Sequence, residues 1–267
     1  MRRKVRNAVC ALALAAGAVV FAASRVNAET VVDLTGPVPQ TTTINGAIYT
    51  TNVQQPTGTG VIRPFVRLDA NGKPGIEAGY NTDARPIESG NDAKADFQYT
   101  HSLALSSLVS TNIGGVDYYQ FLLDSNQTGS SPLLNLNDLQ LYVSSSANLT
   151  GYTGSGFSSG SSTEVYNIDA TTDKGLLLNY SLNSGSGSGD LYVFVPKADF
   201  NVANNTYVYL YSSFGRPNVN NDGFEEWAAV VGANTPPTVP LPASLWGGLA
   251  LLGFLGVAKI RSRRQSA

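Results

Sequence analysis

Alternation of apolar and polar residues with a period of two is the feature that most restricts how this chain can fold. It recurs through most of residues 29–238, and this period places successive side chains on opposite faces of a β-strand. Turn-forming sequences separate the alternating segments. They include Asn45-Gly46, Asn71-Gly72, Asn112-Ile113-Gly114-Gly115 and Asp222-Gly223. The pattern predicts strands over residues 61–68, 97–105, 116–123, 139–143, 175–180, 191–195, 207–211 and 226–231.

The same region lacks the sustained 3.6-residue apolar stripe of an amphipathic helix. Short strands at regular spacing, joined by Gly- and Asn-rich turns, are typical of all-β folds. We therefore expect an all-β domain over residues 29–235, built as an antiparallel, jelly-roll-like β-sandwich.

The first 28 residues have the composition of a signal peptide. A basic start (Arg2, Arg3, Lys4 and Arg6) precedes an uncharged apolar run over 8–23, and Val26-Asn27-Ala28 fits the small-residue cleavage rule. We predict that signal peptidase cuts after Ala28. Cleavage would also remove Cys10, the single cysteine of the chain, so the mature domain would have no disulfide.

The C-terminus combines three elements over residues 236–267. The motif Val239-Pro240-Leu241-Pro242-Ala243 leads into an uncharged apolar run that ends at Ala258. A helix of that length spans roughly 24 Å, so we extend the predicted transmembrane segment to 243–260. The basic residues Lys259, Arg261, Arg263 and Arg264 follow, and they favour a cytoplasmic end with everything upstream outside the inner membrane. An ordinary single-pass anchor is the alternative interpretation.

Taken in this order, the three elements resemble the sorting signal of the PEP-CTERM class of bacterial surface proteins, in the variant whose motif reads Val-Pro-Leu-Pro-Ala. Leu241 stands where many members carry Glu. The resemblance implies processing by an exosortase, a membrane-embedded cysteine peptidase that cuts near the motif. Pro240 and Pro242 hold the residues before them extended, which suits a peptidase cleft.

The body of the chain is similar to a group of secreted PEP-CTERM proteins without an assigned activity. The similarity covers residues 60–86, 120–141, 179–196 and 220–227. It implies one domain and no catalytic residue, and the class as a whole implies association with exopolysaccharide and biofilm matrix.

Charge separates the two ends from the middle. All 19 Asp and Glu residues lie within 29–238, together with eight of the 17 Lys and Arg residues, which gives this region a net charge of −11. Such a surface repels nucleic acids and other anionic polymers unless a divalent cation bridges them. We expect no nucleic-acid partner.

Residue types limit the chemistry that the domain can perform. His101 is the only histidine and is expected within a strand, so neither a zinc enzyme nor a Cys-His nucleophile can be assembled.

Two Ser/Gly-rich segments superficially match catalytic or phosphate-binding motifs. A hydrolase elbow is matched by Gly156-Phe157-Ser158-Ser159-Gly160, but such an elbow needs its histidine after the serine, and His101 precedes it. We interpret 151–162 as a flexible loop. Gly185-Ser186-Gly187-Ser188-Gly189 precedes a strand rather than the helix of a phosphate loop. A carboxylate pair for glycoside hydrolysis stays open, and we expect a non-enzymatic protein.

Oxygen-bearing side chains gather near Gly223 in a pattern that resembles half of a calcium loop. A helix-loop-helix calcium hand would have Glu at the position of Ala229, so we predict a β-sandwich loop site built on Asp222 with Glu225 or Glu226. The alternative is a tight turn whose side chains bond their own backbone. The residues considered as metal ligands are Asn218, Asn220, Asp222, Glu225 and Glu226.

Three tyrosines, Tyr207, Tyr209 and Tyr211, alternate with aliphatic residues and should share one face of a strand. An exposed row of rings could stack on sugars. Packing against Tyr192 and Phe194 is the alternative, since sheets favour cross-strand aromatic pairs.

These observations predict an exported, exosortase-processed surface or extracellular-matrix protein associated with exopolysaccharide. It would cross the inner membrane and meet signal peptidase and exosortase on the way. The alternative function is a carbohydrate-binding module of the β-sandwich type, with Ca²⁺ as the one cofactor considered.

Overall fold

The computed structural model describes residues 29–53, 64–69, 75–87, 98–185, 189–204 and 206–231. These residues form two seven-stranded sheets and three short 3₁₀ helices, without an α-helix in the described ranges. The 3₁₀ helices are η1 (Leu105–Ser107), η2 (Tyr180–Leu182) and η3 (Lys197–Phe200). The predicted all-β class is confirmed.

Sheet A has its strands in the order β1-β11-β9-β13-β5, with β10 paired to β9 and β6 paired to β13. Their bounds are β1 (Thr30–Asp33), β5 (Glu77–Tyr80), β6 (Leu103–Ala104), β9 (Leu133–Ser144), β10 (Thr163–Asn167), β11 (Lys174–Asn179) and β13 (Tyr207–Phe214).

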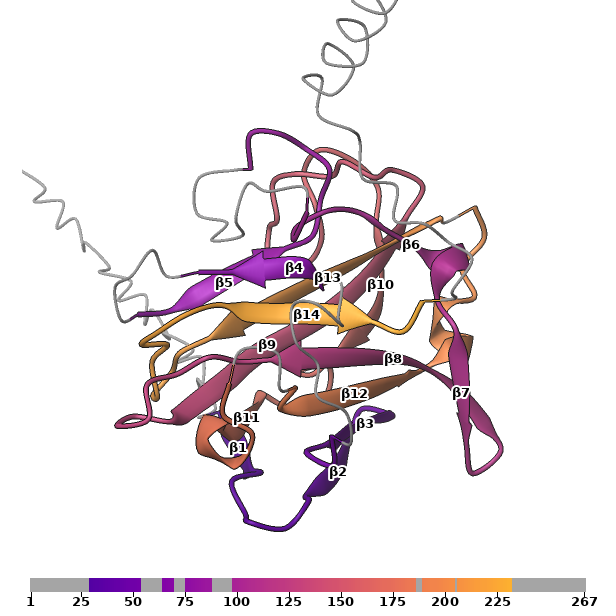
Figure 1. Ribbon diagram of the computed structural model, residues 1–267. Coiled ribbons are helices and arrows are strands. Elements are labelled where there is room, and N and C mark those ends of the chain that lie inside the picture. Colours follow the sequence, from indigo (N-terminus) through magenta and orange to yellow (C-terminus); the bar gives the residue numbers. More distant parts are fainter. Residues whose placement is uncertain are drawn as a thin grey trace, which may run out of the picture.

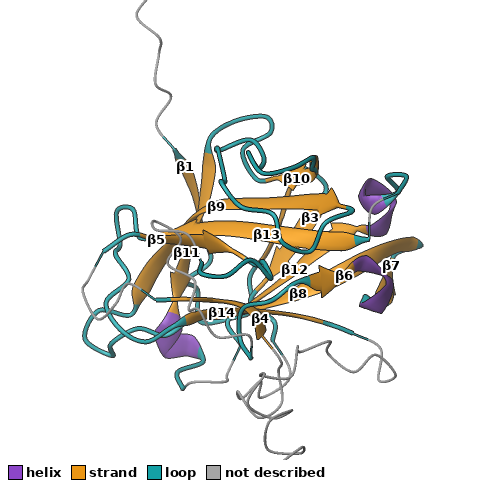
Figure 2. Ribbon diagram, turned by 90° about the horizontal axis from the view of Figure 1, so that it is seen from above, coloured by secondary structure: helices purple, strands orange, loops and turns teal. Residues whose placement is uncertain are grey.

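Sheet B has the order β2-β3-β12-β8-β14-β4, with β7 paired to β8. Its strands are β2 (Thr41–Ile44), β3 (Ala47–Thr50), β4 (Pro64–Leu68), β7 (Ser110–Ile113), β8 (Val116–Asp124), β12 (Leu191–Pro196) and β14 (Glu225–Ala229). In Figure 1, β14, β8 and β12 lie in front of β13 and β9, and Figure 2 shows the same layers from above.

One apolar core lies between the two sheets. Alternate residues of β9 and β13, such as Leu141 and Leu210, meet alternate residues of β12 and β14, such as Val193 and Trp227. The indole N–H of Trp227 donates a hydrogen bond to Ser212 Oγ in sheet A at 3.0 Å, as a buried indole N–H requires a partner. The sheets therefore face each other as the two layers of a sandwich.

The strands with clear alternation are largely where the sequence places them. The predictions at 116–123, 191–195 and 207–211 fall within β8, β12 and β13, and 139–143 falls within the longer β9. The prediction at 175–180 corresponds to β11, except that Tyr180 begins η2, and 226–231 corresponds to β14, which ends at Ala229. The part of 61–68 that the structure describes is β4.

Sheet A is not purely antiparallel, contrary to expectation. β1 runs parallel to β11, with Val31 opposite Gly175 and Asp33 opposite Leu177. A parallel neighbour needs a long connection rather than a tight turn. Because β1 is joined to β11 through most of the domain, this pairing meets that requirement.

The prediction of a strand at 97–105 is also wrong. Of its described residues only Leu103 and Ala104 pair in a sheet, and His101 lies in a loop rather than within a strand. Side-chain hydrogen bonds take the place of strand pairing in this segment. The Arg85 guanidinium donates to the Thr100 carbonyl at 2.6 Å, and the Asp83 carboxylate accepts from the Ser102 amide and hydroxyl.

Two predicted turns form tight hairpins. Asn45 and Gly46, at φ 49° and 88°, join β2 to β3, and Gly114 and Gly115, at φ 60° and 89°, join β7 to β8. Positive φ at both central residues is the requirement of the hairpin turn that matches strand twist. The side chain of Asn45 also donates to the carbonyl groups of Asn167 and Ile168, which ties this hairpin to the other sheet.

The signal segment 1–28 and the sorting segment 236–267 lie outside the described residues. The described ranges contain no helix long and apolar enough to cross a membrane.

Candidate functional site

The tyrosine row lies on the outer face of sheet A. Tyr207, Tyr209 and Tyr211 share that face of β13, as expected, while Val208 and Leu210 point into the main core. Tyr209 is fully buried, however, in a second apolar cluster that covers the sheet. The buried members of this cluster are Tyr80, Tyr142, Leu149, Phe157 and Tyr209.

The loop at 145–162 provides the cover. The Tyr209 hydroxyl donates to the Ser146 carbonyl at 2.7 Å and accepts from the Leu149 amide at 3.0 Å. Tyr152 and Phe157 pair across the loop, and the Tyr152 ring stacks on Tyr211 with 3.8 Å between centroids. The predicted loop at 151–162 is confirmed as a loop. Its residues Tyr152 and Phe157 pack on the sheet, so the tyrosine row is not an open platform.

The alternative prediction, that the tyrosine row packs against Tyr192 and Phe194, is also wrong. Tyr192 and Phe194 lie in β12 of sheet B, so they cannot pack against the outer face of β13. Their rings contact each other instead, with 5.9 Å between centroids.

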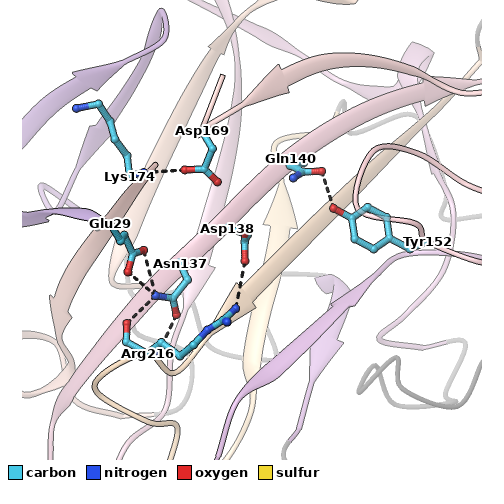
Figure 3. Close-up of polar contacts among 8 residues, drawn as sticks. All are labelled: Glu29, Asn137, Asp138, Gln140, Tyr152, Asp169, Lys174 and Arg216. Atoms are coloured by element: carbon cyan, nitrogen blue, oxygen red, sulfur yellow. Dashed lines mark hydrogen bonds and ion pairs between the residues drawn. The ribbon is translucent and has the colours of Figure 1, made fainter. Parts of the chain in front are cut away.

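A polar array lies beside the tyrosines on sheet A (Figure 3). The Asn137 amide donates to both Glu29 carboxylate oxygens and to the Arg216 carbonyl, and the Arg216 guanidinium lies 3.9 Å from Asp138. Gln140 accepts from the Tyr152 hydroxyl at 2.6 Å. The side chains of this array thus bond mainly to one another.

Carboxylate groups crowd the end of this array near β1. Burial raises the pKa of Asp169 to about 6, against the hydrogen bond from the Lys174 amide, and Asp138, Asp173 and Glu29 add to the rise. Burial also raises the pKa of Glu29, with Asp173 contributing.

The five residues considered for calcium do not converge on one point. Asn218 bonds Asn135, Asp222 is exposed, and Glu226 lies 3.9 Å from Arg67. Asn220 and Glu225 do meet, because the Asn220 amide donates to the Glu225 carboxylate. The described residues contain no group of three or more His, Cys, Asp or Glu side chains arranged for a metal ion.

Glu225 is completely buried next to a second carboxyl group. It hydrogen-bonds Glu77, also completely buried, and accepts from Gln127 at 3.4 Å. Burial and then the interaction with Glu77 raise the pKa of Glu225 well above its usual range. The Asp222 amide donates to Asn220 Oδ1 at 3.1 Å, which is the self-bonded turn described as the alternative to a calcium loop.

A groove lined by described residues lies on the outer face of sheet B, over β3, β12 and β8. Figure 1 shows how these three strands adjoin. Tyr192 and Phe194 form its floor, because alternate residues of β12 (Leu191, Val193 and Val195) point into the core. The groove has a volume of about 490 Å³. The remaining lining residues are Thr41, Ile48, Thr50, Asn52, Thr111, Ile113 and Gln120.

Polar groups stand beside the two rings. Phe194 lies opposite Gln120 and Ile48 on the neighbouring strands, and Tyr192 lies opposite Thr50. Neither the Gln120 side-chain amide nor the Tyr192 hydroxyl has a hydrogen-bond partner among the described residues. The groove therefore offers two aromatic rings, one hydroxyl and one amide to a ligand.

Buried carboxyl groups lie at the ends of two strands that carry the groove, β12 and β8. Asp190 immediately precedes β12, and its Oδ2 accepts from the amide and the hydroxyl of Ser125, each at 2.8 Å. Burial raises the pKa of Asp190 to about 8, and the nearby Asp124 adds to the rise. Asp124 lies opposite Glu226 across β8 and β14.

From the sequence, Tyr192 and Phe194 are predicted only as packing partners of the tyrosine row. Their alternation with Leu191, Val193 and Val195 was visible and places them together on one face. Which sheet carries β12, and what covers that sheet, depends on the topology. Comparison of the chain with family models, with curated proteins and with solved structures gives no significant match.

Proposed function

We propose that this chain is an exported, non-enzymatic surface or matrix protein that binds exopolysaccharide through the groove on sheet B. The observation that carries the proposal is the open pair Tyr192 and Phe194 with hydrogen-bonding groups beside it. The flatter face of a sugar ring presents C–H groups to an aromatic face, and its hydroxyl groups need partners such as Gln120 and Thr50.

The net charge of the domain limits which class of polysaccharide it can bind. The net charge of the domain between residues 29 and 238 is −11. An anionic chain would be repelled. A neutral or amino-substituted polysaccharide is the class that fits.

The strand order supports the proposed jelly-roll topology. Sheet B contains β4-β14-β8-β12 and sheet A contains β5-β13-β9-β11 as neighbours. Along the chain, successive strands of this set change sheet except between β9 and β11, in the manner of two Greek keys. Open sheet faces of such sandwiches are suited to extended ligands.

Processing by signal peptidase and exosortase remains part of the proposal. β1 begins at Thr30, so cleavage after Ala28 leaves every described strand intact. The last described strand, β14, ends at Ala229, ten residues before the Val239–Ala243 motif. A peptidase can therefore act at either end without cutting any of the described strands.

The test is affinity electrophoresis of the purified full chain in gels that contain the exopolysaccharide of the source bacterium. We expect retardation of the wild-type protein, and loss of most of it in Tyr192→Ala and Phe194→Ala. Tyr211→Ala, on the outer face of sheet A, is the matched aromatic control and should be retarded like the wild type. Equal retardation of all four proteins would overturn the groove assignment.

We propose calcium as an accessory ion at Glu225 and Asn220. Their buried contact and the hydrogen bond between Glu225 and Glu77 support this, since a divalent ion could replace the proton that two adjoining carboxyl groups share.

A further inference from the structure

A second, smaller cavity adjoins the groove at the edge of the sandwich. It has a volume of about 180 Å³ and shares Asn52 with the groove. The β1–β2 connection at 36–39, the end of β3, and the segment from β11 through η2 form its wall. Asp190, which also lines it, precedes Tyr192 by two positions. Two positions along a strand are about 7 Å, with side chains on the same face.

Within the part of the chain that the structure describes, the polar side chains of the cavity retain hydrogen-bonding capacity. Asn179 Oδ1 accepts from the Ser181 amide and hydroxyl, which leaves its NH₂ group. Asn183 donates to the Gly189 carbonyl at 3.3 Å, which leaves its side-chain oxygen. The Asn52 side chain is exposed and bonds no group within the described residues.

Asp190 adds a carboxyl group with one oxygen unused. Ser125 occupies Oδ2, whereas the buried Oδ1 has no hydrogen-bond partner in the described part of the chain. A buried polar atom without a partner is costly. It is thus a second indication, independent of the cavity, that a polar ligand belongs here.

The rest of the wall is apolar, with Leu178, Leu182 and Pro37 among its members. Amide groups and a carboxyl group set among apolar side chains suit a ligand with hydroxyl groups on its rim and C–H groups on its faces. A volume of about 180 Å³ is below the roughly 300–1,000 Å³ of pockets for drug-sized molecules. One sugar ring is the ligand of this kind that fits.

We propose that this cavity binds the terminal sugar residue of a polysaccharide whose following residues lie on Tyr192 and Phe194. The proposal rests on the proposed function and makes it specific: the protein recognises chain ends. A cavity that admits one ring beside an open groove allows a chain to enter from the groove and end at Asn179, Asn183 and Asp190.

The experiment uses the full chain purified in detergent and the exopolysaccharide of the source bacterium, intact and after partial acid hydrolysis. Hydrolysis multiplies chain ends at constant sugar mass. We expect the protein bound at saturation, per sugar mass, to rise in proportion to the number of ends. Asn183→Ala and Asp190→Ala should each weaken binding to the hydrolysed chains roughly three- to tenfold, as one lost hydrogen bond does. Asn201→Ala, a surface substitution away from the cavity, should not.

The outcomes separate the two proposals. Wild-type binding that Tyr192→Ala removes, but with a capacity independent of hydrolysis and unchanged in Asn183→Ala, would overturn end recognition and leave the groove standing. Failure of the wild type to bind either preparation would overturn both. Melting curves of each variant show whether a weakened variant is still folded.

Discussion

Tyr209 holds Leu149 against the outer face of sheet A. Its hydroxyl oxygen accepts a hydrogen bond from the Leu149 amide at 3.0 Å, and both side chains belong to the same buried apolar cluster. A tyrosine that looks like part of a sugar-binding row in the sequence is thus the attachment point of the loop at 145–162.

Replacing this tyrosine should therefore destabilise the fold. Tyr209→Ala removes a buried aromatic side chain, and we expect the free energy of unfolding to fall by about 3–5 kcal/mol. Tyr209→Phe keeps the ring but leaves the Leu149 amide without its acceptor, which should cost about 1–3 kcal/mol. Urea unfolding measures both, and a Tyr209→Ala protein within 1 kcal/mol of wild type would contradict the packing described.

The alternation of residues predicted the strands that form the centre of the fold. β8, β12 and β13 carry runs of large apolar side chains on their inner faces, and such runs are readable without context. β2 is Thr-Thr-Thr-Ile and β7 is Ser-Thr-Asn-Ile. Short polar strands like these are recognisable only through the neighbour they pair with, so the sequence did not reveal them.

The candidate site was harder to predict because it depends on which surface remains open. The alternation of side chains along a strand places Tyr207, Tyr209 and Tyr211 together on one face of β13. It places Tyr192 and Phe194 together on one face of β12 in the same way. The two faces differ in whether a loop covers them, because Phe157 and Leu149 of the 145–162 loop pack on the face that carries Tyr209. A Ser/Gly-rich sequence gives no sign that its few apolar residues will pack onto a sheet.

Removal of both termini is the prediction for export. Signal peptidase should cut after Ala28, and an exosortase should cut between the Val239–Ala243 motif and the membrane segment. Mass spectrometry of the surface fraction should then find Glu29 as the first residue and no peptide containing Arg261–Arg264. Recovery of the C-terminal peptide from mature surface protein would refute exosortase processing.

Calcium should stabilise the folded protein through Glu225 and Asn220. Burial and Glu77 raise the pKa of Glu225, so protons and Ca²⁺ compete for the same oxygens. We expect millimolar Ca²⁺ to raise the melting temperature by several degrees, in line with mass action, and more at pH 8 than at pH 5. Glu225→Gln should remove the rise, whereas Asp222→Ala, at an exposed position, should retain it. Identical melting curves in Ca²⁺ and in chelator, at both pH values, would leave only the turn interpretation.

Asp190 should make the stability of the protein depend on pH in a specific direction. Burial raises its pKa from the ordinary value of 3.8 to about 8, so between these values the folded chain holds a proton that the unfolded chain releases. The contribution is complete below about pH 4 and is lost as pH rises through 8. At 1.36 kcal/mol per pKa unit, the upper limit of that loss is roughly 6 kcal/mol.

Asp190→Asn tests this sign directly. The amide oxygen can still accept from Ser125, as Oδ2 does now, but the side chain no longer ionises. We expect equal free energies of unfolding for variant and wild type at pH 4, and a more stable variant at pH 8 and above. Asp117→Asn, at an exposed position of β8, is the matched control and should follow the wild-type curve. If the Asp190→Asn and wild-type curves run parallel from pH 4 to pH 9, Asp190 is ionised in the folded protein, and burial does not set its charge.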